Sequence, residues 1–167
     1  MKEIEIRPKK LFEKFIYFTK LDIKKYFKRS RKEINCVACN KKGRFSFKKN
    51  NFIYAECINC NTLFVSPRPN ESEFSEYYTK ASSIKYLAKS YYKKTEEIRK
   101  SKIWKPKAKL ISKILKKNNL VKSNCIDIGG GYGVFAKEIK KNIRGKSVVI
   151  EPSPFLAKES RKKKLDL

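Results

Sequence analysis

The chain has 167 residues, of which 40% are hydrophobic and 13% aromatic, and its formal net charge is +27. The aromatic content excludes a disordered tail, because disordered chains are poor in aromatic and branched side chains. The charge comes mostly from lysines spread over the whole length, which is typical of a solvated surface, so we discount nucleic acid as a dedicated partner without excluding it.

The chain lacks the signals of secretion and of membrane insertion. The first thirty residues contain no uncharged apolar core, and no stretch approaches the roughly 20 apolar residues that a membrane span needs. Four of the five cysteines form two Cys-x-x-Cys pairs, a pattern that favours metal binding in a reducing compartment over disulfides. We therefore expect a cytoplasmic protein without a transmembrane segment.

Residues 1–33 are predicted to hold a basic amphipathic helix over residues 10–29. Apolar side chains recur there at helical spacing, with lysines between them. We expect an ordinary docking helix, although the same pattern is found in helices that bind membrane surfaces or partner proteins.

Residues 34–69 predict a zinc ribbon. Cys36 and Cys39 form one Cys-x-x-Cys pair, and Cys57 and Cys60 form the other after 17 intervening residues, a spacing typical of four-thiolate zinc sites. A closed shell of four cysteines leaves no position for water or substrate, so the zinc is expected to be structural. Four cysteines that are merely buried or redox-active are the alternative.

The local sequence fits such a ribbon. Alternating runs predict a β-hairpin that turns at Lys49–Asn50, and a further short strand is expected at residues 63–65, before two prolines. Asn40 and Asn61 follow the two cysteine pairs, where the turn often needs a positive φ that asparagine tolerates.

Residues 70–121 are predicted to be helical. Asn70 is expected to cap a first helix. An apolar stripe that includes Tyr91 and Tyr92 predicts one buried helix face, and we expect these tyrosines in the core and at its rim, with a cofactor site as the alternative. Pro106 suits the first turn of a helix over residues 106–117.

Residues 122–167 predict the start of a sheet of parallel strands. Residues 125–128 read as a buried strand, a glycine-rich turn and a helix follow, and residues 147–150 form a second strand. In such units, ligands bind at the carboxyl ends of the strands. The candidate cofactor residues there are Asp127, Gly129, Gly130, Gly131, Gly133 and Glu151.

Two cofactors compete for this site. The run from Gly131 to Ala136 matches a permissive Gly-x-Gly-x-x-Ala, which favours a nicotinamide dinucleotide. However, Asp127 and the Gly129-x-Gly131-x-Gly133 spacing resemble motif I of the class I S-adenosylmethionine-dependent methyltransferases. This resemblance implies that Asp127 recognises the amino group of S-adenosylmethionine and that Glu151 holds the ribose hydroxyls.

The resemblance extends over about residues 34–158. The four-cysteine ribbon followed by residues 63–69 and by Glu76-Tyr77-Tyr78 is similar to the amino-terminal part of bacterial methyltransferases that join a zinc-binding module to the transferase domain. Some of these act on sugar nucleotides or in polysaccharide synthesis, which implies a small-molecule acceptor.

The expected fold class is therefore α/β, with a zinc ribbon and a helical segment leading into the first β-α-β unit of an incomplete Rossmann-like methyltransferase fold. Because only two strands of the sheet are encoded, we expect a truncated enzyme. The chain contains no histidine, and no motif identifies a catalytic residue, the acceptor or the oligomeric state. A non-enzymatic zinc ribbon that binds nucleic acid or protein is the alternative from another class.

Overall fold

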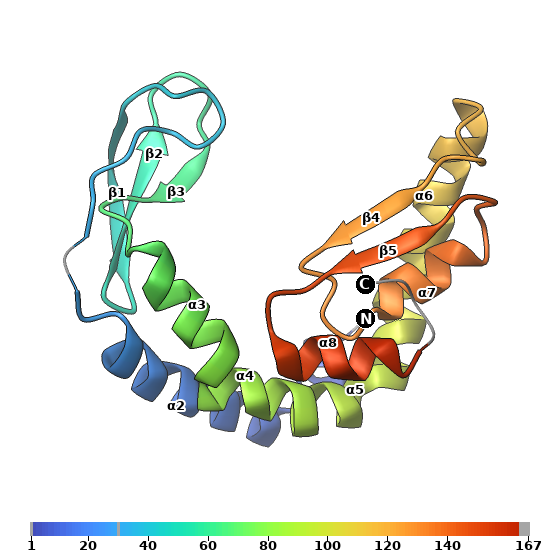
Figure 1. Cartoon of the computed structure of the whole chain (residues 1–167), viewed down its shortest axis with the longest axis horizontal. Helices are drawn as coiled ribbons and strands as arrows, with labels where there is room; N and C mark the ends of the chain where they lie inside the picture. The colour runs from blue at the N-terminus through green and yellow to red at the C-terminus, as the bar shows by residue number, and fades with distance from the viewer. Residues whose placement is uncertain (1, 30, 164–167) are drawn as a thin grey trace. The chain divides into compact units, whose positions relative to one another are not determined.

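The computed structural model describes residues 2–29 and 31–163, so residues 164–167 of the predicted α/β segment lie outside the described residues. The chain forms two compact units, one made by Thr19–Tyr77 and the other by the residues before and after that range. It passes from one unit to the other within α2 (Lys9–Tyr26) and α3 (Glu71–Lys80) (Figure 1). None of the helices in the described ranges is long and apolar enough to cross a membrane.

The unit Thr19–Tyr77 contains an antiparallel sheet of β1 (Gly43–Lys49), β2 (Phe52–Cys57) and β3 (Leu63–Val65), in the order β1-β2-β3 (Figure 1). The hairpin turns at Asn50 and Asn51, whose φ angles are 50° and 65°. The turn therefore lies one residue later than the sequence predicts, because two consecutive asparagines supply the two positive φ angles that a tight two-residue hairpin loop requires.

An aromatic cluster joins the helices of this unit to its sheet, and a helix cap and a buried carboxylate fix the start of α3. The ring of Phe27 lies 5.2 Å from that of Phe74 and 5.3 Å from that of Phe52. As predicted, Asn70 caps α3, since its Oδ1 accepts a hydrogen bond from the Glu73 N–H at 3.1 Å. The buried Glu73 carboxylate in turn accepts a hydrogen bond from the Arg29 N–H at 2.8 Å.

In the other unit, a continuous helical run interrupts its α-helical geometry with two π-helical turns. The short helix α1 (Glu3–Ile6) contacts this run. The contact is made by Tyr91 of the run, whose Oη donates to the Ile6 carbonyl at 3.4 Å. The predicted helix over residues 10–29 begins at Lys9, directly after Pro8. It ends earlier than predicted, at Tyr26. In chain order the run comprises α4 (Ser82–Tyr86), η1 (Leu87–Tyr91), α5 (Tyr92–Arg99), η2 (Lys100–Trp104) and α6 (Lys105–Lys117), of which η1 and η2 are the π-helical turns.

The predicted β-α-β unit forms at the expected residues. The elements are β4 (Cys125–Ile128), α7 (Val134–Lys140), β5 (Ser147–Ile150) and α8 (Pro154–Arg161). β4 and β5 pair in parallel, with their carboxyl ends at the same edge. α7 contacts this sheet and also packs on α6, where Ala108, Ile139 and Ile143 form a buried cluster (Figure 1). The mixed helix and sheet content is thus as predicted, although the sheets are small and one of them is antiparallel.

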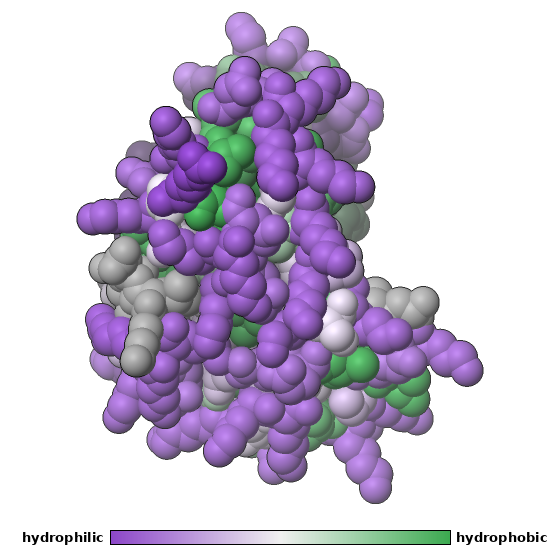
Figure 2. Space-filling view, turned by 90° about the vertical axis from the view of Figure 1, so that its right-hand side faces the viewer, coloured by the Kyte–Doolittle hydropathy of each residue, from purple (hydrophilic) through white to green (hydrophobic). Residues whose placement is uncertain are grey.

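The other face of the β4–β5 sheet is uncovered, which corrects the expectation of a fully buried strand. Ile126, Ile128 and Ile150 are 59%, 80% and 51% exposed. Figure 2, which faces the right-hand side of Figure 1, shows patches of hydrophobic surface among mostly hydrophilic side chains. A parallel sheet is normally covered on both faces, so the exposure of these three isoleucines is unusual for such a sheet.

Candidate functional sites

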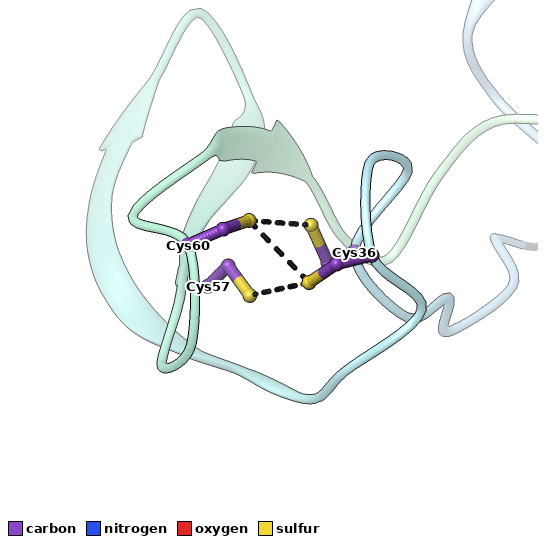
Figure 3. A group of neighbouring side chains, drawn as sticks. Cys36, Cys57 and Cys60 are labelled. Carbon is purple, nitrogen blue, oxygen red and sulfur yellow. Dashed lines mark hydrogen bonds between the residues drawn. The ribbon is translucent and has the colours of Figure 1, made fainter.

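The four cysteines of the ribbon converge on one point. Their sulfur atoms all lie within 4.8 Å of one another, and Figure 3 shows Cys36, Cys57 and Cys60 pointing into the space between two loops. The Sγ atom of Cys39 is 3.4 Å from those of both Cys57 and Cys60, and the Sγ atoms of Cys36 and Cys60 are 3.6 Å apart. Four sulfurs at about 2.3 Å from a zinc ion would be about 3.8 Å apart, so this donor set fits a tetrahedral metal site.

Two similar tight turns aim the sulfurs. In the first turn, the Ala38 N–H donates to Cys36 Sγ at 3.4 Å, and in the second the Asn59 N–H donates to Cys57 Sγ at the same distance. The residues that follow the two pairs have φ angles of 57° at Asn40 and 56° at Asn61, as the sequence predicts. These N–H groups stabilise negative charge on the sulfurs, which is the form that binds metal.

Hydrogen bonds within the cluster shift the pKa values of Cys60 and Cys39 in opposite directions. The Thr62 hydroxyl and backbone N–H lower the pKa of Cys60 to about 6. At Cys39 the Lys41 N–H acts in the same direction, but the neighbouring Cys60 and Cys57 thiols outweigh it and raise the pKa of Cys39 to about 11. A single divalent ion at the centre would favour the thiolate form of both cysteines, because it stabilises all four thiolates together.

A second candidate site is a cavity of about 280 Å³ beside the glycine-rich turn. This volume is slightly below the roughly 300–1,000 Å³ of typical ligand pockets. The cavity lies within one unit, at the carboxyl end of β4, where α/β sheets bind ligands. Its wall is formed by Tyr92, Glu96, Arg99, Trp104, Lys107, Ile111, Asp127, Gly129, Gly130, Gly131, Tyr132, Val134 and Phe135.

The glycine turn requires glycine for two different reasons. Gly129, Gly131 and Gly133 have φ angles of 73°, 55° and 68°, a region that other residues rarely adopt. At Gly130 the reason is space, because a Cβ atom there would lie 2.7 Å from Asp127 Oδ2. The turn therefore packs directly on the Asp127 carboxyl group.

Asp127 carries its carboxylate into the cavity wall without an ionic partner. Among the described residues it forms no ion pair, although Lys107 lies near enough to influence it electrostatically. Burial raises the pKa of Asp127, Lys107 opposes this effect, and the charge of Glu151 adds to it. A cationic group of a ligand would stabilise this partly desolvated carboxylate.

The other predicted cofactor residues do not all line the cavity. Gly129, Gly130 and Gly131 do, whereas Gly133 precedes α7 and is outside the wall. Glu151 is also outside it, and its carboxylate accepts hydrogen bonds from the N–H groups of Gly131 and Ser153, both at 2.9 Å. Glu151 thus ties the tip of β5 to the glycine turn and retains lone pairs for further hydrogen bonds.

Sequence reasoning missed the helical wall of the cavity. Tyr91 and Tyr92 were expected in the core and at its rim rather than in a cofactor site; Tyr91 is buried, whereas Tyr92 is half-buried and lines the cavity. Arg99 and Trp104 carry no recognisable motif, and the only available signal was the single tryptophan of the chain beside cationic residues. Comparisons of this chain with protein-family models, with curated proteins and with solved structures gave no match.

Proposed function

We propose that this chain binds S-adenosylmethionine in the cavity beside the glycine turn and belongs to a methyltransferase, with a structural zinc ion held by the four cysteines. The observation that carries this proposal is the Asp127 carboxylate, which has no ion-pair partner among the described residues and lies in the wall of a cavity at the carboxyl ends of two parallel strands. The amino group of the cofactor would supply the missing positive charge.

The cavity is large enough for one end of the proposed cofactor. Its volume of about 280 Å³ is sufficient for the amino-acid end, and the glycine turn allows a close backbone approach. The adenosine would extend over the strand ends towards Glu151, whose free lone pairs suit the ribose hydroxyls. When bound, the cofactor supplies a sulfonium methyl group to an acceptor nucleophile, and the protein contributes mainly positioning.

A nicotinamide dinucleotide fits the same wall less well. Its pyrophosphate would need a glycine turn free of negative charge, whereas Gly130 packs against the Asp127 carboxyl group and Gly131 donates its N–H to Glu151. Two carboxylates at the turn would repel a pyrophosphate. For the acceptor, the resemblance of the amino-terminal part favours a small molecule such as a sugar nucleotide.

Calorimetric titration of the zinc-loaded chain tests this proposal. We expect S-adenosylmethionine to bind and NAD⁺ to give no binding heat. Asp127→Asn should lower the affinity for S-adenosylmethionine roughly 10- to 150-fold, because a hydrogen bond to a charged group contributes about 1.5–3 kcal/mol.

Glu97→Gln is the matched control, since it removes one negative charge from an exposed position on α5 outside the cavity wall. Its affinity should equal that of the unmodified chain, and thermal unfolding followed by circular dichroism should show that both variants are folded. Binding of NAD⁺, or salt-sensitive binding of a mixed DNA and RNA pool without any binding of S-adenosylmethionine, would contradict the proposal.

A further inference from the structure

The cavity wall contains a cation that its surroundings do not neutralise. The guanidinium carbon of Arg99 lies 5.4 Å from the ring centroid of Tyr92 and 5.9 Å from that of Trp104. One of its nitrogens donates to the Ile6 carbonyl at 3.5 Å, which is a long hydrogen bond. Within the described part of the chain, Arg99 therefore has aromatic and carbonyl contacts but no carboxylate partner.

The neighbouring charges leave Arg99 available to a ligand. Glu96 is the other acid of the wall besides Asp127, and it is already paired with Lys163 at 2.5 Å. Lys107 lies with its Nζ 5.3 Å from the Trp104 ring centroid, on the same wall. Among the described residues, neither the Asp127 carboxylate nor the cations of Arg99 and Lys107 form an ion pair, and this charge pattern complements a zwitterion.

The helix geometry supports a functional role for this wall. Tyr92 directly follows the π-helical turn η1, Arg99 directly precedes η2, and Trp104 ends η2. A π-helical turn holds more residues than an α-helical turn, so it rotates the side chains that follow it, and such turns frequently occur at functional sites. These two turns bracket the segment that carries Tyr92 and Arg99, and the second of them carries Trp104.

We propose that Arg99 binds the carboxylate of the amino-acid end of the cofactor while Asp127 binds its ammonium group. This inference rests on the proposed function, because it assigns the second charge of the same ligand. A guanidinium offers two parallel N–H groups that match the two oxygens of a carboxylate. The rings of Tyr92 and Trp104 restrict the orientation of this fork before the ligand arrives, and Lys107 adds positive charge at the same wall.

The test compares S-adenosylmethionine with decarboxylated S-adenosylmethionine, which lacks only the carboxylate. We expect the unmodified chain to bind S-adenosylmethionine at least 10-fold more tightly than the decarboxylated compound. Arg99→Gln should weaken binding of S-adenosylmethionine roughly 10- to 150-fold, as expected for a lost hydrogen bond to a charged group. The same variant should change the affinity for the decarboxylated compound less than threefold.

The controls separate this role from a structural one. Arg99→Lys keeps the charge without the fork and should retain part of the preference, whereas Arg144→Gln, at an exposed position outside the wall, should retain all of it. Equal affinity of the unmodified chain for both compounds overturns the inference, even if Arg99→Gln fails to fold. An equal loss for both compounds in Arg99→Gln also overturns it, because Arg99 would then only shape the cavity. Absence of any binding by the unmodified chain would instead refute the proposed function.

Discussion

Cys57→Ser is expected to abolish metal binding and to unfold the ribbon formed by β1, β2 and β3. Cys57 is 1% exposed, and its sulfur lies 3.4 Å from that of Cys39. The buried core of the ribbon consists of Cys36, Ala55, Cys57 and Phe64, so two of its four members are candidate metal ligands. A core of this size cannot offset the entropy of ordering the loops without the metal.

The expected magnitude is large, because apparent zinc-binding free energies of small zinc modules are about 10–16 kcal/mol at neutral pH. Metal analysis should give one zinc ion per unmodified chain and none for Cys57→Ser. Hydrogen exchange should show that the amides of β2 lose their protection, and a strong chelator should have the same effect on the unmodified chain.

Cys125→Ser is the matched control for this experiment. Cys125 lies outside the cluster, half-buried on β4, so its replacement should leave the zinc content unchanged. Absence of zinc from the unmodified chain would show that the cluster is not a metal site, and retention of zinc by Cys57→Ser would show that Cys57 is not needed to hold it. Full β2 protection after complete removal of the metal would show that the ribbon folds without it.

Gly145→Ala is expected to destabilise the β4–β5 unit by about 3 kcal/mol or more, at the upper end of the cost of overpacking. A Cβ atom at this position would lie 2.1 Å from the Ser123 carbonyl oxygen and 2.7 Å from that of Lys122. Both contacts are with backbone, so the loops before β4 and before β5 would have to separate. The Cys125 N–H donates to the Lys146 carbonyl at 2.8 Å across the same place, and this bond would be strained or lost.

Urea unfolding followed by circular dichroism measures this cost, with Gly129→Ala as the comparison. Gly129 has a φ of +73° but nothing within 4 Å of an added Cβ, so its replacement should cost only about 1–2 kcal/mol of backbone strain. Because the pairing of β4 with β5 positions Asp127 beside Val149, Gly145→Ala should also abolish ligand binding in the cavity. Equal stability of the two variants would contradict the steric explanation.

The uncovered face of the β4–β5 sheet contributes little to the stability that urea unfolding would measure. Ile126, Ile128 and Ile150 expose an apolar surface, and two strands are fewer than an independently stable sheet usually has. We therefore expect the stability of this unit to depend on its helical face, where Ala108 and Ile139 are almost fully buried.

Local sequence was sufficient for the elements whose chemistry is encoded within a few residues. The spacing of the cysteines and the asparagines after each pair predict the two tight turns, because a positive φ and two sulfurs on one turn are local requirements. The apolar runs and glycines likewise predict β4, the turn and β5 at the residues where they form. Even the hairpin turn was displaced by only one residue.

Which residues form the cavity wall depends on tertiary structure. Arg99 and Trp104 precede the glycine turn by many residues, and a periodic reading assumes 3.6 residues per turn, so it could not anticipate the rotation caused by the π-helical turns η1 and η2. The same holds for Glu151, whose hydrogen bonds to Gly131 and Ser153 depend on how the strand tips meet. The sequence by itself determined which residues could bind a metal and where the glycine turn lies, since these follow from spacing and backbone preference. Only the folded chain determined which charges of the cavity remain unpaired, because that depends on the neighbours each side chain meets in space.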